Sequence, residues 1–234
     1  MNVELISYTE LGEKACGVAA KTCVASDMPS MDDDNSKSLM HALSSGHDSI
    51  AEHMTFTFAI EGISRACSHQ LVRHRVASYS QQSQRYVKMD GFDYVVPESI
   101  KNHEKTWDED GKTDVAKWFA NAMEGLSEIY ARLVSEGIPD EDARYVLPNA
   151  CKTNIVVTMN ARSLMNFFKY RLCNRAQWEI KQVAEMMLAL VKEVAPSIFE
   201  NAGARCKATG ICPEKRSCGK CPKLETLQER NIIN

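Results

Sequence analysis

The chain has 234 residues, of which 44% are hydrophobic, so it is long enough to bury its own core. Its net charge of −3 and pI near 6.1 exclude a strongly basic protein that attracts nucleic acid through its overall field. The sequence contains no run of about 18 apolar residues, the length that a membrane span requires. Its first residues, MNVELISYTELGEKACG, lack the basic region followed by an apolar region that marks a secretory signal. We therefore expect a globular cytoplasmic protein without a nucleic-acid or membrane partner.

The N-terminal part of the chain predicts helices on either side of a strand. Residues 9–21 and 36–46 have the apolar spacing of helices, and Gly46 is a residue type common just after a helix end. Residues 54–62, MTFTFAIEG, alternate apolar and polar side chains with the two-residue period of a half-buried strand. Helical spacing returns over 62–72.

The C-terminal part predicts longer helices. The polar segment 100–113 predicts an exposed loop. Residues 114–136 carry apolar side chains on one face, as in a long amphipathic helix that ends at Gly137. Residues 153–160, TNIVVTMN, are rich in β-branched side chains and predict a strand. Further helices are expected over 140–147, 161–173 and 177–194.

These elements predict an α+β fold. We expect a single domain with a central, mostly antiparallel sheet packed by helices, plus the long amphipathic helix. The boundary falls near residue 200: the main, catalytic domain is expected over 1–200 and a Cys-containing C-terminal tail over 201–234. The nine cysteines are an odd number and mostly scattered, which is typical of reduced thiols rather than a disulfide scaffold.

Two windows of the sequence carry arginine and lysine without any acidic residue. They run over 62–89 and 143–178. Arginine presents a planar fork of donors that suits phosphate oxygens. In the stretch 73–86, RHRVASYSQQSQRY, arginines are interleaved with Ser and Gln, a mixture that can orient a ligand. The windows predict phosphate-sized pockets; the alternative is a solvated basic face.

Several motifs together resemble one enzyme family. Arg73-His74-Arg75 followed after seven residues by Ser83 is the signature of the flavin-dependent thymidylate synthases (ThyX). The likeness continues in the blocks GHDSIAEHMTFTF, SQRY, DEDARYVLP, NARSLMNFFKYR and RAQWEI, which follow in the expected order over about residues 46 to 183. The chain therefore resembles this family over most of its length.

The resemblance implies a methyltransferase of nucleotide biosynthesis that converts dUMP to dTMP. It implies FAD as the cofactor, NADPH as its reductant, and methylene-tetrahydrofolate as the one-carbon donor, released as tetrahydrofolate. Turning a transferred methylene into a methyl group takes two electrons, and a reduced flavin can deliver them as hydride. A homotetramer with sites shared between subunits is also implied.

The resemblance assigns three groups of site residues. The positions that match FAD contacts are His47, Ser49, Glu52, Arg73, His74, Arg75, Gln81, Asn160, Arg162 and Asn166. The positions that match dUMP contacts are Gln70, Arg73, Gln81, Gln82, Ser83, Gln84, Arg85, Arg144 and Arg171. Arg171 is also the expected catalytic residue, because a guanidinium beside the uracil carbonyls would stabilise negative charge that develops on the ring.

The spacing within the predicted helix 161–173 is compatible with two ligands. Arg162 and Asn166 are four residues apart and share a face, whereas Arg171 points about 140° away from Asn166. Asn160 could cap this helix as well as contact a ligand. Ser83 is expected to hydrogen bond to dUMP rather than to act as a nucleophile, because only His74 is near enough in sequence to activate it.

The tail departs from the family pattern. Cys206, Cys212, Cys218 and Cys221 have C-x5-C-x5-C-x2-C spacing, and four thiolates could close a tetrahedral structural zinc site. The alternative is a set of reduced thiols. No other metal site is expected, since the histidines lack the H-x-x-x-H spacing of a helical metal motif.

Two other functions stay open at this point. A nucleotide- or RNA-binding protein without catalysis would carry no yellow chromophore and would bind polynucleotide with steep salt dependence. An FAD-dependent NADPH oxidase would keep the flavin but would not methylate dUMP. The sequence has matches for both FAD and dUMP, which favours the synthase.

Overall fold

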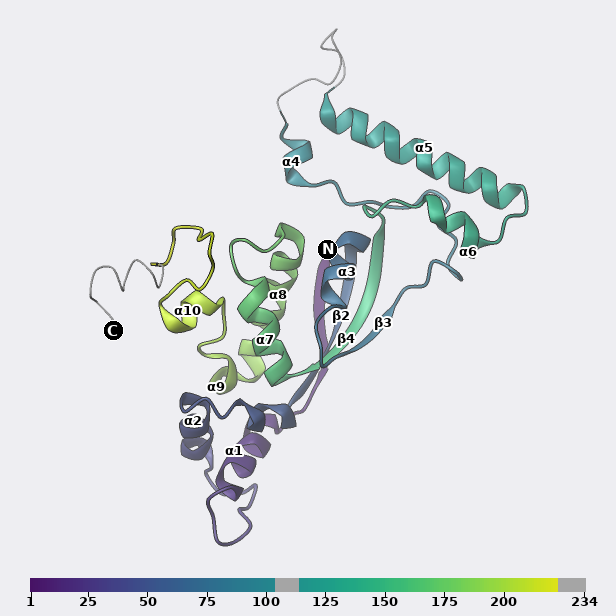
Figure 1. The fold of residues 1–234 in the computed structure, drawn as a ribbon. Coiled ribbons are helices and arrows are strands. Elements are labelled where there is room, and N and C mark those ends of the chain that lie inside the picture. Colours follow the sequence, from purple (N-terminus) through teal and green to yellow (C-terminus); the bar gives the residue numbers. More distant parts are fainter. Residues whose placement is uncertain (104–113, 223–234) are drawn as a thin grey trace. The chain divides into compact units, whose positions relative to one another are not determined.

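The computed structural model describes residues 1–103 and 114–222, so most of the loop predicted over 100–113 lies outside the described residues. Four strands form one sheet in the order β1-β2-β4-β3 (Figure 1). Their bounds are β1 (Asn2–Tyr8), β2 (Thr55–Ser64), β3 (Ser78–Gln81) and β4 (Lys152–Asn160).

Strands β2 and β4 run in opposite directions. The hydroxyls of Thr57 and Thr158 lie 2.9 Å apart, and Gly62 N donates to Asn154 Oδ1 at 3.0 Å, so the partner's number falls as the number on β2 rises. Within β2, buried Phe56, Phe58 and Ile60 alternate with less buried residues. The predicted α+β class and the half-buried strand are confirmed.

The longer helices follow the apolar spacing of the sequence, and short helices lie between and after them. They are α1 (Gly12–Thr22), α2 (Ser36–Ser44), η1 (Asp48–His53), α3 (Arg65–Leu71), α4 (Glu98–Lys101), α5 (Val115–Ser135), α6 (Asp140–Ala143), η2 (Arg144–Val146), α7 (Ala161–Arg171), α8 (Trp178–Val194), α9 (Pro196–Phe199) and α10 (Arg205–Thr209). Gly46 and Gly137 follow α2 and α5 with φ of 80° and 84°, a conformation that favours glycine. Across 1–103 and 114–222, none of the helices combines the length and apolar character that crossing a membrane requires.

One predicted boundary is wrong. The helix expected over 62–72 begins only at Arg65, because β2 continues through Ser64. Gly62 N donates its hydrogen bond to the side chain of Asn154 on β4 and is therefore not available for a helical hydrogen bond. This part of the backbone stays in the sheet.

The chain divides into two compact units that alternate along the sequence. The first unit takes Met1–Asn2, Ile60–Gln70 and Ser80–Ile155; the second takes Val3–Ala59, Leu71–Tyr79 and the chain from Val156 onward. Strands β2 and β4 therefore each contribute residues to both units. The expected domain boundary near residue 200 stays a prediction.

The core of the first unit forms against α5. Buried Met89, Phe92 and Tyr130 cluster there, and Tyr130 Oη accepts a hydrogen bond from Met89 N at 3.2 Å. Asp114 caps the helix by accepting from Lys117 N at 2.6 Å. The long amphipathic helix predicted over 114–136 is confirmed.

The core of the second unit is rich in phenylalanine. The Phe199 ring meets Phe56 at a centroid distance of 5.5 Å and Phe168 at 6.0 Å, both edge to face. Short α9, which carries Phe199, is held in place because the Glu13 carboxylate accepts from Ser197 N at 2.7 Å and Ile198 N at 3.2 Å. This cluster fixes the position of α7, on which several predicted site residues lie.

We expect Phe199→Ala to lower the free energy of unfolding by about 3–5 kcal/mol, because it removes a fully buried ring and leaves a cavity. Phe199→Leu fills part of that space and should cost less. Chemical denaturation of the three proteins measures both values. A loss below about 1 kcal/mol for the alanine variant would contradict a tightly packed ring at this position.

Candidate functional site

A pocket of about 490 Å³ in the second unit gathers polar side chains from η1, from the chain after α3 and from α7. We call it pocket A. Its lining is Asp48, Glu52, Arg75, Val76, Asn160, Arg162, Ser163, Asn166 and Lys169. Five of these match predicted FAD contacts: Glu52, Arg75, Asn160, Arg162 and Asn166. The structure therefore brings half of the predicted cofactor set into one cavity.

The start of α7 is anchored beside pocket A. Asn160 Oδ1 accepts from Ser163 N at 2.8 Å and so caps the helix, as the sequence predicted. Ala161 N donates to Met54 O at 2.8 Å. Since Asn160 also lines the pocket, its capping role and its position beside a ligand site coexist. The positive end of the helix dipole lies at this end of α7, where anions are favoured.

The charges in pocket A are partly paired. Arg162 forms an ion pair with Glu52, and Lys169 Nζ lies 3.9 Å from Asp48 Oδ2. Three cationic side chains thus face two carboxylates. With two asparagine amides beside them, these donors fit a ligand that combines a diphosphate with a hydrogen-bonding ring system, which is the chemistry of a dinucleotide.

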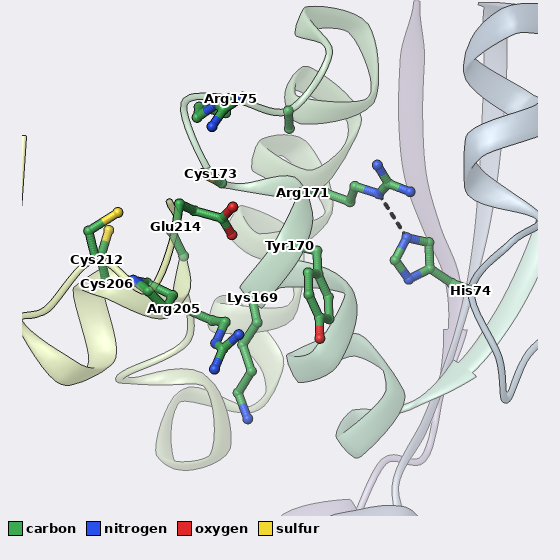
Figure 2. A pocket seen from close by; sticks show the side chains of 13 residues that line it. His74, Lys169, Tyr170, Arg171, Cys173, Arg175, Arg205, Cys206, Cys212 and Glu214 are labelled. Atoms are coloured by element: carbon green, nitrogen blue, oxygen red, sulfur yellow. Dashed lines mark hydrogen bonds between the residues drawn. The ribbon is translucent and has the colours of Figure 1, made fainter. Parts of the chain in front are cut away.

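A second pocket of about 330 Å³, pocket B, lies at the other end of α7. It is lined by His74, by Lys169–Arg171, by Cys173, Arg175 and Ala176 after the helix, and by Ala204–Cys206 and Cys212–Glu214 of the tail. Figure 2 shows the side chains of Arg171 and His74 pointing toward one another. Arg171 Nε donates to His74 Nε2 at 2.8 Å.

That hydrogen bond defines the state of His74. Because arginine can only donate, Nε2 must offer its lone pair, so the imidazole is neutral and its proton lies on Nδ1. The ring also packs edge to face on Phe167, with centroids 4.9 Å apart. Burial, and then the charge of Arg171, lower the pKa of His74 to about 4. His74 therefore orients Arg171. Its Nε2 lone pair accepts the bond from Arg171 and cannot also take a proton from Ser83, which argues against His74 as the base that activates Ser83.

The first unit holds a separate cluster of arginines. Arg85 Nη2 lies 2.8 Å from Glu141 Oε2, and Arg144 Nε donates to the backbone oxygen of Glu141 at 3.0 Å. Arg65 Nη1 donates to Gln82 O at 3.5 Å. Burial, and then the nearby charge of Arg144, hold the pKa of Arg65 below its usual value. Like charges gathered in this way favour a bound anion.

The predicted dUMP residues are divided between the two units. Those in the first unit are Gln70, Gln81, Gln82, Ser83, Gln84, Arg85 and Arg144, and those in the second are Arg73 and Arg171. Ser83 Oγ accepts from Arg85 N at 3.1 Å. The Gln81 amide donates to Ser68 Oγ at 2.9 Å and Thr153 Oγ1 at 3.2 Å, so its nitrogen is committed within the chain.

Some predicted residues lie outside the pockets, and some lining residues were not predicted. His47, Ser49 and Arg73 are exposed and do not line pocket A. Asp48, Ser163 and Lys169 do line it. Lys169 could have been found from its spacing, since it lies seven residues after Arg162 on the same helix face. Arg65 lies in the first acid-free window but matched no family contact.

The tail does not assemble the predicted zinc ligands. Within residues 1–103 and 114–222, no group of three or more His, Cys, Asp or Glu side chains is arranged to hold a metal ion. The four proposed ligands do not all converge: Cys218 Sγ lies 3.7 Å from Asn174 Nδ2, whereas Cys221 and Cys212 lie close enough to Cys206 to raise its pKa. Cys212 is buried beside pocket B.

We expect His74 to titrate near pH 4. Because its pKa is lower in the folded chain than in the unfolded one, His74 contributes stability that is present above pH 6.5 and is lost as the pH falls toward about 4. NMR of the imidazole signals measures the midpoint, and His74→Gln identifies which signal disappears. A midpoint near 6.5 would contradict a neutral His74 that accepts a bond from Arg171.

Comparisons with known proteins identify the family of the chain. Residues 4–197 match the Thy1 family, described as thymidylate synthase complementing protein. The chain is 49% identical to a flavin-dependent thymidylate synthase of Geobacter sulfurreducens, over 97% of each chain, and 44% identical to one of Clostridium tetani, over 97% of this chain and 96% of that one. A crystal structure of a UMP/dUMP methylase, PolB from Streptomyces cacaoi, bound with 5-Br dUMP, superposes with a TM-score of 0.72 at 27% identity, over 85% of this chain and 93% of that chain. The chain therefore belongs to the Thy1 family, the family of the flavin-dependent thymidylate synthases.

Proposed function

We propose that this chain is a flavin-dependent thymidylate synthase that methylates dUMP to dTMP. The observation that carries the proposal is pocket A, where five family FAD positions meet although Glu52 and Arg162 are 110 residues apart in sequence. The proposed one-carbon donor is methylene-tetrahydrofolate, and the proposed reductant is NADPH. The dUMP analogue bound to the related methylase supports the choice of pyrimidine nucleotide.

We assign FAD to pocket A. Arg75, Arg162 and Lys169 would hold the diphosphate, with Glu52 keeping the Arg162 side chain in place through their ion pair. The amides of Asn160 and Asn166 would bond to the remaining polar groups of the cofactor. When bound and reduced, FAD supplies the hydride that completes the methyl group.

We assign dUMP to the arginines of both acid-free windows. Arg85 and Arg144 would bind the phosphate, and the amides and hydroxyl of residues 81–84 would orient the nucleotide. Arg171 would face the uracil ring, where its guanidinium stabilises negative charge that develops on the carbonyl oxygens. Neutral His74 accepts from the Nε of Arg171 and would add no charge of its own to the ring site.

We propose further that the active enzyme is a homotetramer with sites shared between subunits. The proposal rests on the membership of the chain in the family of the flavin-dependent thymidylate synthases, for which the sequence resemblance implies this assembly. A cytoplasmic location is also proposed. It is supported by the nine cysteines, all of which are free thiols, as is usual in a reducing compartment.

Arg171→Ala should lower kcat for dTMP formation by about 10²–10³-fold, because it removes a preorganised cation from the developing negative charge. Bound FAD, followed by its visible absorbance, should stay, since Arg171 does not line pocket A. Arg132→Ala, which removes an exposed arginine from α5, is the matched control and should keep full activity.

Full turnover in Arg171→Ala would refute the catalytic role of Arg171. A wild-type protein without flavin absorbance would instead refute the proposed function. A protein that binds flavin but does not form dTMP from dUMP would support the alternative function, an FAD-dependent NADPH oxidase.

Mixing two inactive variants tests the shared sites. Arg171→Ala and Arg144→Ala each remove one nucleotide residue. If one site draws these arginines from different subunits, hybrid tetramers formed by mixing contain some sites with both, so activity should rise above that of either variant alone. Steady-state dTMP formation before and after subunit exchange measures the effect. No recovery in verified hybrids would show that each site uses both arginines of the same chain.

A further inference from the structure

The C-terminal tail folds back on itself and brings two cysteines together. Helix α10 ends at Gly210, whose φ of 71° turns the chain, and Cys212 N then donates to Pro222 O at 2.8 Å. As a result Cys221, at the far end of the segment, lies beside Cys206 on α10. The Cys221 thiol donates to the Cys206 backbone oxygen over a distance of 4.0 Å, and Cys221 lies close enough to the Cys206 thiol to raise its pKa.

We propose that Cys206 and Cys221 form a reversible intrachain disulfide, which makes the tail a site of thiol–disulfide exchange. The backbone bond between Cys212 and Pro222 holds the two segments together, and Cys221 Sγ reaches the backbone of Cys206, so small side-chain rotations can bring the two sulfurs to bonding distance. Both are partly exposed, so a small oxidant can reach them. The pairing differs from the C-x2-C pair that the sequence spacing alone suggests, which would join Cys218 to Cys221.

Other thiols near this pair differ from it in exposure or partner. Cys218 is exposed but is directed to Asn174, with its Sγ 3.7 Å from the amide nitrogen. Cys212 and Cys173 are close enough to act on the pKa of Cys206. Cys212 is buried, so an oxidant reaches it less easily than it reaches Cys221.

The exchange needs a low-molecular-weight disulfide as oxidant. The Cys221 sulfur attacks one sulfur of that molecule, forms a mixed disulfide and releases the first small thiol. The Cys206 sulfur then attacks the Cys221 sulfur, forms the internal bond and releases the second small thiol. Both cysteines lose a proton and are oxidised together, and the small disulfide takes up the two electrons and two protons.

The pair lies next to pocket B. Cys206 lines this pocket with its neighbours Ala204 and Arg205, and residues 212–214 of the same tail complete that wall (Figure 2). The wall is further tied to the end of α7 through Arg175, which donates to Arg216 O. Closing the disulfide would fix the wall of the pocket that also contains Arg171.

Oxidation of the full-length protein tests the proposal without reference to dTMP formation. The reduced protein is incubated with oxidised glutathione, digested under non-reducing conditions and analysed by mass spectrometry. We expect a Cys206–Cys221 cross-link that dithiothreitol reverses. Thiol titration of the denatured protein should fall by two per chain, from the nine cysteines of the sequence to seven.

Single variants identify the pair. Cys206→Ser should lose the cross-link and keep glutathione on Cys221, whereas the matched control Cys218→Ser should form the cross-link as the wild type does. A cross-link through Cys218, no cross-link in the wild type, or a stoichiometric zinc ion that protects these thiols would each overturn the proposal.

Discussion

The burial of one face of α7 is the constraint on which both pockets depend. Leu164, Phe167 and Phe168 are completely buried, and two of their rings join the phenylalanine cluster around Phe199. Rotating the helix would expose these side chains to water, at a cost of about 1.5–3 kcal/mol for each one. The rotation of α7 about its axis is therefore fixed by packing, and the polar residues inherit their directions from it. Arg162 and Asn166 line pocket A, while Arg171 lies at pocket B.

The cationic side chains of pocket A are held by ion pairs that add little stability. Exposed ion pairs such as Arg162 with Glu52 and Lys169 with Asp48 contribute little to stability, because water screens them and the long side chains lose freedom. Their value lies in orientation, since the guanidinium and ammonium groups are already extended toward the cavity. At Arg171 one partner is the neutral imidazole of His74, which accepts from Nε and orients the side chain without adding a charge.

The predictable parts of the fold are the helices and strands in which buried side chains recur at the helical or the strand period. Strand β2 and helix α7 both show such a period, and the capping role of Asn160 could be read from its position before the helix. Strand β1 buries only Val3, and β3 has no buried residue, so neither carries an apolar period that would mark it as a strand.

Contacts between distant segments were not predictable from local patterns. Nothing in the sequence around Glu52 indicates Arg162, 110 residues later, and only the family motifs placed both at one cofactor. The pairing of the tail cysteines was likewise not predictable from the sequence. Their spacing suggests four equivalent candidates, but the turn at Gly210 and the bond between Cys212 and Pro222 decide that Cys206 meets Cys221.

Glu141 holds the guanidinium of Arg85 in an ion pair with which an incoming anion must compete. Its carboxylate already occupies Arg85, and both side chains are about half exposed, with 48% and 50% of their surface accessible. A doubly charged phosphate attracts Arg85 more strongly than one carboxylate does and can take its place, whereas an uncharged nucleoside has nothing to offer in exchange. Discrimination between a nucleotide and its nucleoside would then start from this competition for Arg85, before any contact with the base is made.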